Sequence, residues 1–249
     1  MVTIHLRLYE ELNDYLAPER RKRTFAWEVS EGASLGEVVD ALAVPRAVID
    51  LALADGVPVG FDHRVGDGER IALYPVFEAL DVGPVTALPG RPLRRTRFVL
   101  DVHLGRLARY LRLLGFDATY RSDFGDEELA AIAAAEDRLL LSRDRPLVAR
   151  RELLRAYLIT ATAPCEQAVE VVRRCDLNRQ VQPFRRCLMC NTEVTIVAAE
   201  SIAAPLPEWV RATHQEVRRC PGCGRVYWRG GHWRRMQRLV DAILRDAEE

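Results

Sequence analysis

Apolar and polar positions alternate in short stretches over the first eighty residues, which is the pattern of half-buried β-strands. Strands are predicted at residues 2–8, 25–29, 57–59 and 71–76. Ser34 is followed three residues later by Glu37, a capping-box spacing that predicts the start of a helix. Strands around one helix indicate a small α+β domain over residues 1–82.

The pattern changes after residue 97, where apolar runs alternate with stretches of helical spacing. Strands are predicted at residues 98–100, 116–120, 139–141 and 157–159. Gly115 is expected to end the helix that follows the first of them. Strands that alternate with helices indicate an α/β domain with a parallel sheet over residues 97–180.

Two further segments complete the predicted organisation. Residues 83–96 contain three prolines and two glycines, which predicts an exposed linker. Residues 181–249 contain two Cys-x-x-Cys pairs and end in a predicted helix over 233–246. The length of 249 residues suits two domains with a small appendage.

Composition excludes several classes of protein. Apolar residues make up 49% and charged residues 29% of the chain, as in a globular protein with a substantial core. No run of 18 apolar residues is present, which argues against a membrane-spanning helix. The first residues lack a basic region followed by an apolar stretch, so we expect a cytoplasmic protein without a secretory signal.

Charge is unevenly distributed although the net charge is zero. Residues 1–82 hold 8 Lys/Arg against 15 Asp/Glu, and residues 83–249 hold 28 against 21. A basic second part is compatible with a nucleic-acid partner and also with ordinary surface charge.

Four of the six cysteines form two closely spaced pairs, Cys187/Cys190 and Cys220/Cys223, separated by 29 residues. In a reducing cytoplasm these pairs favour metal ligation over disulfide bonds. Two such pairs predict a tetrahedral site for a structural Zn²⁺ ion.

Acidic residues lie at the ends of predicted strands and at the start of a predicted helix in the α/β domain. Asp101 ends the first strand and Asp144 lies just past the third, at the edge where parallel sheets place their sites. Asp126 and Glu127 open a helix that should face the same edge. Oxygen ligands of this kind suit Mg²⁺ or Mn²⁺. The alternatives are complementarity to the helix dipole at 126–128 and an N-cap role for Asp144.

Arginine and aromatic residues are candidate RNA contacts. Arg106, Arg109 and Arg112 recur at three-residue spacing and predict either a phosphate-binding face or a solvated helix face. Further candidates lie after the third strand and near the second cysteine pair: Arg143, Arg225, Trp228, His232 and Arg235. Some aromatic residues of the last group are expected to pack the final helix instead.

The pattern of residues 1–82 resembles the ubiquitin-like β-grasp fold, in particular the small sulfur carriers of molybdopterin and thiamine synthesis. Those carriers work through a terminal Gly-Gly, whereas this chain has a single Gly83 there and continues. A sulfur-carrier or conjugation role is therefore disfavoured, and binding of a protein partner is expected.

Residues 97–240 resemble the Mut-seven C-terminal ribonuclease family. The resemblance rests on the segments 98–116, 126–129, 140–145, 187–190, 220–228 and 231–236. It implies a PIN-like nuclease fold with a zinc ribbon, and a ubiquitin-like domain in front is a known arrangement in bacterial members. By resemblance, Asp101, Asp126 and Asp144 correspond to acidic positions of PIN-like nucleases, with Glu127 or Asp123 as a fourth ligand.

These observations lead to a metal-dependent ribonuclease as the expected function. Its substrate would be RNA, with tRNA and ribosomal RNA as candidates, and its ions a structural Zn²⁺ and a catalytic Mg²⁺ or Mn²⁺. The alternative is a non-catalytic RNA- or ribosome-binding protein with the same fold.

Overall fold

The computed structural model describes residues 1–75, 86–88, 96–150, 152–153, 155–202 and 206–248. The predicted linker over residues 83–96 lies outside the described residues except at 86–88 and 96. Two compact units are formed, an N-terminal unit of Met1–Asp101 with Phe124–Leu158 and a C-terminal unit of Val102–Asp123 with Ile159–Glu249.

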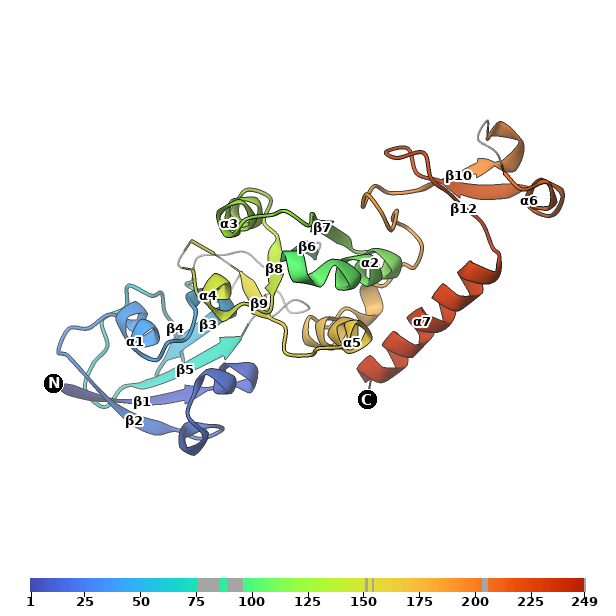
Figure 1. Ribbon diagram of the computed structural model, residues 1–249. Coiled ribbons are helices and arrows are strands. Elements are labelled where there is room, and N and C mark those ends of the chain that lie inside the picture. The colour runs from blue at the N-terminus through green and yellow to red at the C-terminus, as the bar shows by residue number, and fades with distance from the viewer. Residues whose placement is uncertain (76–85, 89–95, 151, 154, 203–205, 249) are drawn as a thin grey trace. The chain divides into compact units, whose positions relative to one another are not determined.

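The N-terminal unit begins with a five-stranded sheet and one α-helix (Figure 1). Its elements are β1 (Val2–Leu8), β2 (Phe25–Val29), α1 (Leu35–Ala41), β3 (Ile49–Ala54), β4 (Val57–Pro58) and β5 (Arg70–Pro75). The strand order is β2-β1-β5-β3-β4, in which β1 and β5 are parallel and the other neighbours are antiparallel. This arrangement confirms the expected ubiquitin-like domain.

Helix α1 begins as its sequence predicts. The Ser34 hydroxyl accepts a hydrogen bond from the Glu37 amide at 3.2 Å, and the Glu37 carboxylate accepts one from the Ser34 amide at 2.7 Å. This capping box satisfies two amides that the first helical turn would leave without partners. Leu35 and Val39 of α1 are fully buried, as is Leu6 of β1.

The same unit contains a parallel sheet. Its elements are β6 (Arg97–Leu100), α3 (Asp126–Ala135), β8 (Leu139–Ser142), α4 (Arg145–Val148) and β9 (Ala156–Leu158). Strands β6, β8 and β9 pair in parallel in that order, with Leu100 opposite Leu141. Leu100 and Leu141 are fully buried, which explains the continuous apolar runs in the sequence.

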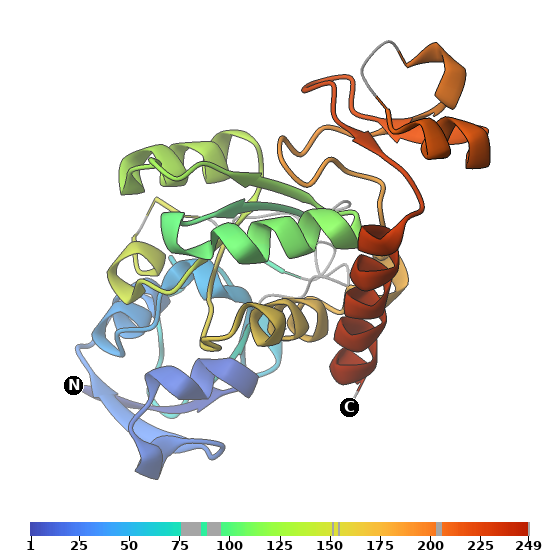
Figure 2. The same cartoon turned by 45° about the vertical axis from the view of Figure 1, so that its right-hand side comes forward.

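The C-terminal unit holds the remaining elements. They are α2 (Gly105–Leu114), β7 (Asp117–Tyr120), α5 (Pro164–Arg174), β10 (Thr195–Ala198), α6 (Glu208–Thr213), β11 (Glu216–Arg219), β12 (Val226–Tyr227) and α7 (Gly231–Glu248). Helix α7 packs beside α5 (Figures 1 and 2). It begins two residues before, and ends two residues after, the helix predicted over 233–246.

Helix α2 ends at Gly115, as predicted. Gly115 has a φ of +101°, and a Cβ atom at this position would collide with the carbonyl oxygen of Gln182. A glycine is therefore required both by the left-handed backbone and by the close approach of another chain segment.

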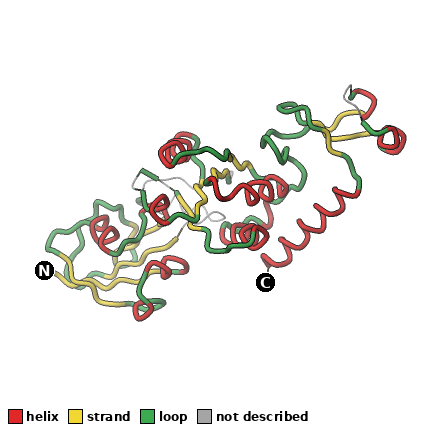
Figure 3. The backbone as a smooth tube through the Cα atoms, viewed as in Figure 1, coloured by secondary structure: helices red, strands yellow, loops and turns green. Residues whose placement is uncertain are grey.

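Strands β10, β11 and β12 form a small antiparallel sheet, drawn in yellow in Figure 3. One of its faces packs on a separate small core of Ala199, Ile202, Val210 and Val217, joined by Val197, Val226 and Trp228. This sheet carries the second cysteine pair at its end.

Short 3₁₀ helices connect the larger elements. They are η1 (Glu10–Tyr15), η2 (Pro18–Arg20), η3 (Arg46–Val48), η4 (Val102–Leu104), η5 (Asn178–Gln180) and η6 (Ala199–Ser201). None of the helices that the structure describes is both long and apolar enough to cross a membrane.

Candidate acidic site and cysteine metal centre

Asp101 lies at the carboxyl end of β6, beside the end of β8. Its amide continues the parallel ladder by donating to the Leu141 carbonyl at 3.0 Å. Its carboxylate accepts a hydrogen bond from the Ser142 hydroxyl at 2.6 Å. The side chain is held in place because Asp101 is only 5% exposed and Ser142 is fully buried.

Asp144 is connected to the same serine. The Asp144 amide donates to the Ser142 hydroxyl oxygen at 2.9 Å, so this hydroxyl links the backbone of Asp144 to the carboxylate of Asp101. Asp144 occupies the N-cap position of α4, as one sequence interpretation proposed, but its side chain makes no capping hydrogen bond. Its exposed carboxylate is therefore not committed to the helix.

Asp126 and Glu127 occupy the first turn of α3, behind the N-cap residue Gly125. Both are exposed, and α3 packs on β6 and β8. Their position satisfies the helix dipole whether or not they have a second role. Asp123, the other candidate for a fourth ligand, is paired with Arg121, whose hydrogen bond lowers the pKa of the Asp123 carboxyl.

In the described part of the chain, the cysteines are the one group of three or more ligand-type residues whose ligand atoms converge. The structure thus brings Asp101 and Asp144 to one serine hydroxyl but does not gather the three aspartates into a preformed cluster.

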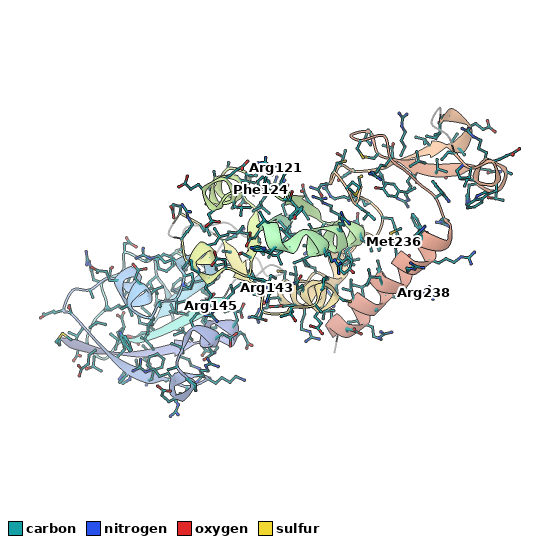
Figure 4. All side chains as sticks on the ribbon, viewed as in Figure 1. Arg121, Phe124, Arg143, Arg145, Met236 and Arg238 are labelled. Carbon is teal, nitrogen blue, oxygen red and sulfur yellow. The ribbon has the colours of Figure 1, made fainter. Side chains whose placement is uncertain are left out.

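The basic candidates occupy different environments. Arg143 and Arg145, both labelled in Figure 4, are exposed residues after β8. The Arg145 guanidinium lies 5.8 Å from the Tyr15 ring centre. Arg106 and Arg109 are exposed on α2.

Arg112 differs from the other two arginines of its helix. It is 4% exposed and donates to the backbone carbonyls of Ala118, Leu188 and Met189. Burial lowers the pKa of this guanidinium. The expectation that Arg112 lies on a phosphate-binding or solvated face is therefore wrong, because its side chain ties α2 to the first cysteine pair.

The four predicted cysteine ligands meet at one point. Their Sγ atoms all lie within 4.8 Å of one another, with Cys187 and Cys223 at 3.5 Å and Cys190 and Cys220 at 3.3 Å. A tetrahedral Zn²⁺ with Zn–S bonds of about 2.3 Å requires sulfur separations of about 3.8 Å. All four thiols are free, so the donor set fits a tetrahedral metal such as zinc.

Both cysteine pairs have the same backbone design. The Asn191 amide donates to the Cys187 carbonyl at 3.0 Å, and the Gly224 amide donates to the Cys220 carbonyl at 2.9 Å. Asn191 and Gly224 have φ values of +69° and +73°. Asparagine and glycine are the residues that most readily adopt this left-handed conformation, which reverses the chain after each pair.

Neighbouring side chains form hydrogen bonds with sulfur atoms of the four-cysteine cluster. The Tyr227 hydroxyl lies 3.1 Å from the Cys187 Sγ atom. Burial opposes ionisation of Cys190, but hydrogen bonds to Thr192 outweigh it and lower the pKa of this thiol to about 6. A low thiol pKa favours the thiolate that binds metals. Asn191 attaches the first pair to β7 through the Ala118 amide at 3.0 Å and the Asp117 carboxylate at 2.7 Å.

The remaining RNA candidates lie beyond the cysteines. Arg225, His232 and Arg235 are exposed. Trp228 is half-buried against the small core of the β10–β12 sheet, the segment called the ribbon. Trp233, at the start of α7, stacks on Phe184 with ring centres 3.6 Å apart, in line with the expectation that some aromatic residues of this region pack the final helix.

Comparisons with known proteins agree with this architecture. Residues 96–240 match the family model described as the Mut7-C RNAse domain, and residues 1–81 match the model described as Mut7-C ubiquitin. No curated protein matches the chain.

Among solved structures, the chain matches small archaeal modifier protein 1 of H. volcanii. The two sequences are 19% identical, and the match covers 30% of this chain and 98% of the other at a TM-score of 0.26.

Proposed function

The chain belongs to the Mut7-C RNAse domain family, and on that premise we propose that it is a metal-dependent ribonuclease. The reaction is hydrolysis of RNA phosphodiester bonds, and the proposed catalytic residues are Asp101, Asp126, Asp144 and Glu127. Candidate substrates include tRNA and ribosomal RNA.

The observation that carries this proposal is the link from Asp101 through Ser142 to Asp144. The carboxyl ends of β6 and β8 meet here, which is the edge where open parallel sheets place their sites. The Ser142 hydroxyl has a single hydrogen to donate, and it donates this hydrogen to the Asp101 carboxylate. The exposed Asp144 carboxylate makes no capping hydrogen bond to α4. Two carboxylates at one edge repel each other in the absence of a cation.

Oxygen ligands of this kind fit Mg²⁺ or Mn²⁺, which would activate a water and stabilise the leaving oxygen. Asp126 and Glu127 sit at the start of α3, whose N-terminal dipole favours a phosphate as well as a carboxylate. We assign Asp126 and Glu127 as the residues that would complete the ligand set of such an ion.

The proposed RNA contacts are exposed arginines and the region beyond the cysteines. Arg106 and Arg109 on α2 and Arg143 after β8 are assigned to phosphates. Arg225, Trp228, His232 and Arg235 are assigned to RNA held by the ribbon, which a Zn²⁺ at the four cysteines would stabilise. The N-terminal ubiquitin-like domain is proposed to bind a protein partner.

The test is incubation of the purified full chain with end-labelled single-stranded RNA and Mn²⁺, Mg²⁺ or EDTA. We expect cleavage with either ion and none with EDTA. Asp144→Asn keeps the shape of the side chain and removes its charge, so cleavage should fall at least about a hundredfold.

Asp176→Asn is the matched control. Asp176 is an exposed aspartate with a φ of +44°, a conformation that asparagine also adopts readily, so this variant should cleave at the wild-type rate. Cleavage by Asp144→Asn at the wild-type rate would contradict the assignment. RNA binding without cleavage under either ion would favour a non-catalytic RNA-binding protein.

A further inference from the structure

A groove of about 460 Å³ lies on the ribbon within the C-terminal unit. Its walls are the segment after α6, strand β11 and the start of α7. Its lining includes Ile196, His214, Glu216, Arg218, Arg229 and Trp233. None of them is needed for the acidic site or for the four cysteines.

Part of the groove is formed by the sheet face that does not pack on the ribbon core, although Val217 and Trp228 of that core also line the groove. Ile196 pairs with Arg218, and Arg218 pairs with Tyr227, so these three side chains share one face. The neighbouring positions Val197 and Val217 point to the other face, where the core lies. Ile196 is 58% exposed, so an apolar side chain is available on the groove face.

Flat groups form one side of the groove. The Trp233 ring stacks on Phe184 at 17° between planes, and the Arg218 guanidinium lies 5.6 Å from the Trp233 ring centre. Arg218 also donates to the Phe184 carbonyl at 3.2 Å, which fixes the guanidinium. A fixed aromatic and guanidinium layer is the type of surface on which a planar base stacks.

Polar groups in the groove have unused capacity. The Nε2 atom of His214 is buried and has no hydrogen-bond partner among the described residues. Its ring is held edge-on to Trp209 at 6.2 Å. A buried polar atom without a partner is costly, so a hydrogen bond from a ligand in the groove would stabilise it. Glu216 adds a carboxylate acceptor to the same groove.

We propose that this groove binds one unpaired nucleotide of single-stranded RNA. The base stacks on the Arg218 guanidinium, which lies over the Trp233 ring, and uses the His214 Nε2 atom and the Glu216 carboxylate for its edge, while the exposed Arg229 pairs with a phosphate. The choice of RNA rests on the proposed ribonuclease function. The groove restricts the substrate class to unpaired strands, because a base inside a duplex is stacked on both faces and paired along its edge.

The test is the affinity of the full zinc-loaded chain for a ten-nucleotide single-stranded RNA, measured without added Mg²⁺ or Mn²⁺ so that cleavage does not contribute. The matching RNA duplex and inorganic polyphosphate are the comparison probes. We expect the single strand to bind at least about tenfold more tightly than either probe.

Three variants address the groove. His214→Phe keeps a flat aromatic ring and removes both ring nitrogens, Ile196→Asp places a charge on an exposed position, and Arg229→Ala removes the phosphate partner. Each should weaken single-strand binding about fivefold to tenfold. Arg219→Ala is the matched control, because Arg219 is exposed on the same strand as Arg218 but points to the opposite face, and its affinity should stay within about twofold of wild type.

Zinc content and tryptophan fluorescence identify any variant that fails to fold. The RNA affinities of the variants that do fold then test the inference. Wild-type affinity in the folded groove variants would overturn the inference, as would equal binding of single strand and duplex. This result is separable from the proposed function. If Asp144→Asn abolishes cleavage but the groove variants bind RNA like wild type, only the inference about the groove is rejected. If the groove variants weaken RNA binding but the wild-type chain does not cleave RNA, only the proposed nuclease function is rejected.

Discussion

A single hydroxyl group, that of Ser142, organises the candidate acidic site. It donates to the Asp101 carboxylate at 2.6 Å and accepts from the Asp144 amide at 2.9 Å. A hydroxyl can donate and accept a hydrogen bond at once, and the Ser142 side chain is fully buried. Ser142 is thus a positioning residue for the proposed reaction.

We expect Ser142→Ala to lower RNA cleavage by about tenfold to a hundredfold, because the Asp101 carboxylate loses its orientation. Unfolding free energy should fall by about 1–3 kcal/mol, since a buried carboxylate loses a donor. The Mn²⁺ concentration for half-maximal cleavage should rise, which a purely structural defect would not produce. Ser142→Thr retains the hydroxyl and should recover most of the activity. Unchanged Mn²⁺ dependence in Ser142→Ala would contradict the positioning role.

At the scale of elements, the two cysteine pairs act as matching halves of one metal-binding unit. Each reverses direction through a left-handed residue, Asn191 or Gly224, and each returns an amide to the carbonyl of its first cysteine. The small core of the ribbon contains four buried residues, with further partly buried residues packed against them. A metal is therefore expected to supply much of the folding energy of this segment.

Removal of zinc should therefore unfold the ribbon while the rest of the chain stays folded. Three of the four tryptophans, Trp209, Trp228 and Trp233, lie in the ribbon or at the start of α7, so fluorescence reports mainly on this segment. We expect a strong chelator, or Cys220→Ser, to shift the emission to longer wavelength. Cys165→Ser, which changes a thiol outside the cluster, is the control and should retain one zinc per chain. Freshly purified protein without zinc would refute this prediction.

At the scale of the whole molecule, the ubiquitin-like domain and the parallel strands β6, β8 and β9 belong to one compact unit. Arg145 at the start of α4 reaches the Tyr15 ring, and η3 packs against β9. None of these contacts involves Asp101, Asp126 or Asp144. The ubiquitin-like domain is accordingly expected to support the stability of the sheet without taking part in chemistry.

A chain that begins at Leu93 should retain RNA cleavage and melt at a lower temperature than the full chain. The physical reason is the loss of the Tyr15 and η3 contacts, which removes stabilising packing but no proposed ligand. Thermal unfolding and the cleavage assay measure the two effects separately, and Arg145→Ala in the full chain should lower the melting temperature by a smaller amount. A shortened chain that is folded yet inactive would place the ubiquitin-like domain in the site.

Local signals in the sequence predicted the elements that depend on local physics. Ser34 and Glu37 specify their capping box within one turn, and Gly115 ends α2 where only glycine fits. Strand β3 was missed because its run Ile49–Ala54 is almost wholly apolar, and such a run does not distinguish strand from helix by periodicity.

The sequence alone predicted most strands of the first two sheets, the main helices and the four cysteines that converge, because caps, periodicity and Cys-x-x-Cys spacing act over a few residues. It also placed Asp101 and Asp144 beyond their strands. Only the tertiary structure decided which side chains meet. Burial turned Arg112 into a structural tie between α2 and the first cysteine pair, and parallel pairing of β6 with β8 put Ser142 against Asp101. The sheet faces also separated the ribbon core from the groove at Arg218 and Trp233. The hydrogen bonds made by Arg112 to the first cysteine pair and by Ser142 to Asp101 join residues 41 to 77 positions apart, and periodicity along the chain carries no information about such contacts.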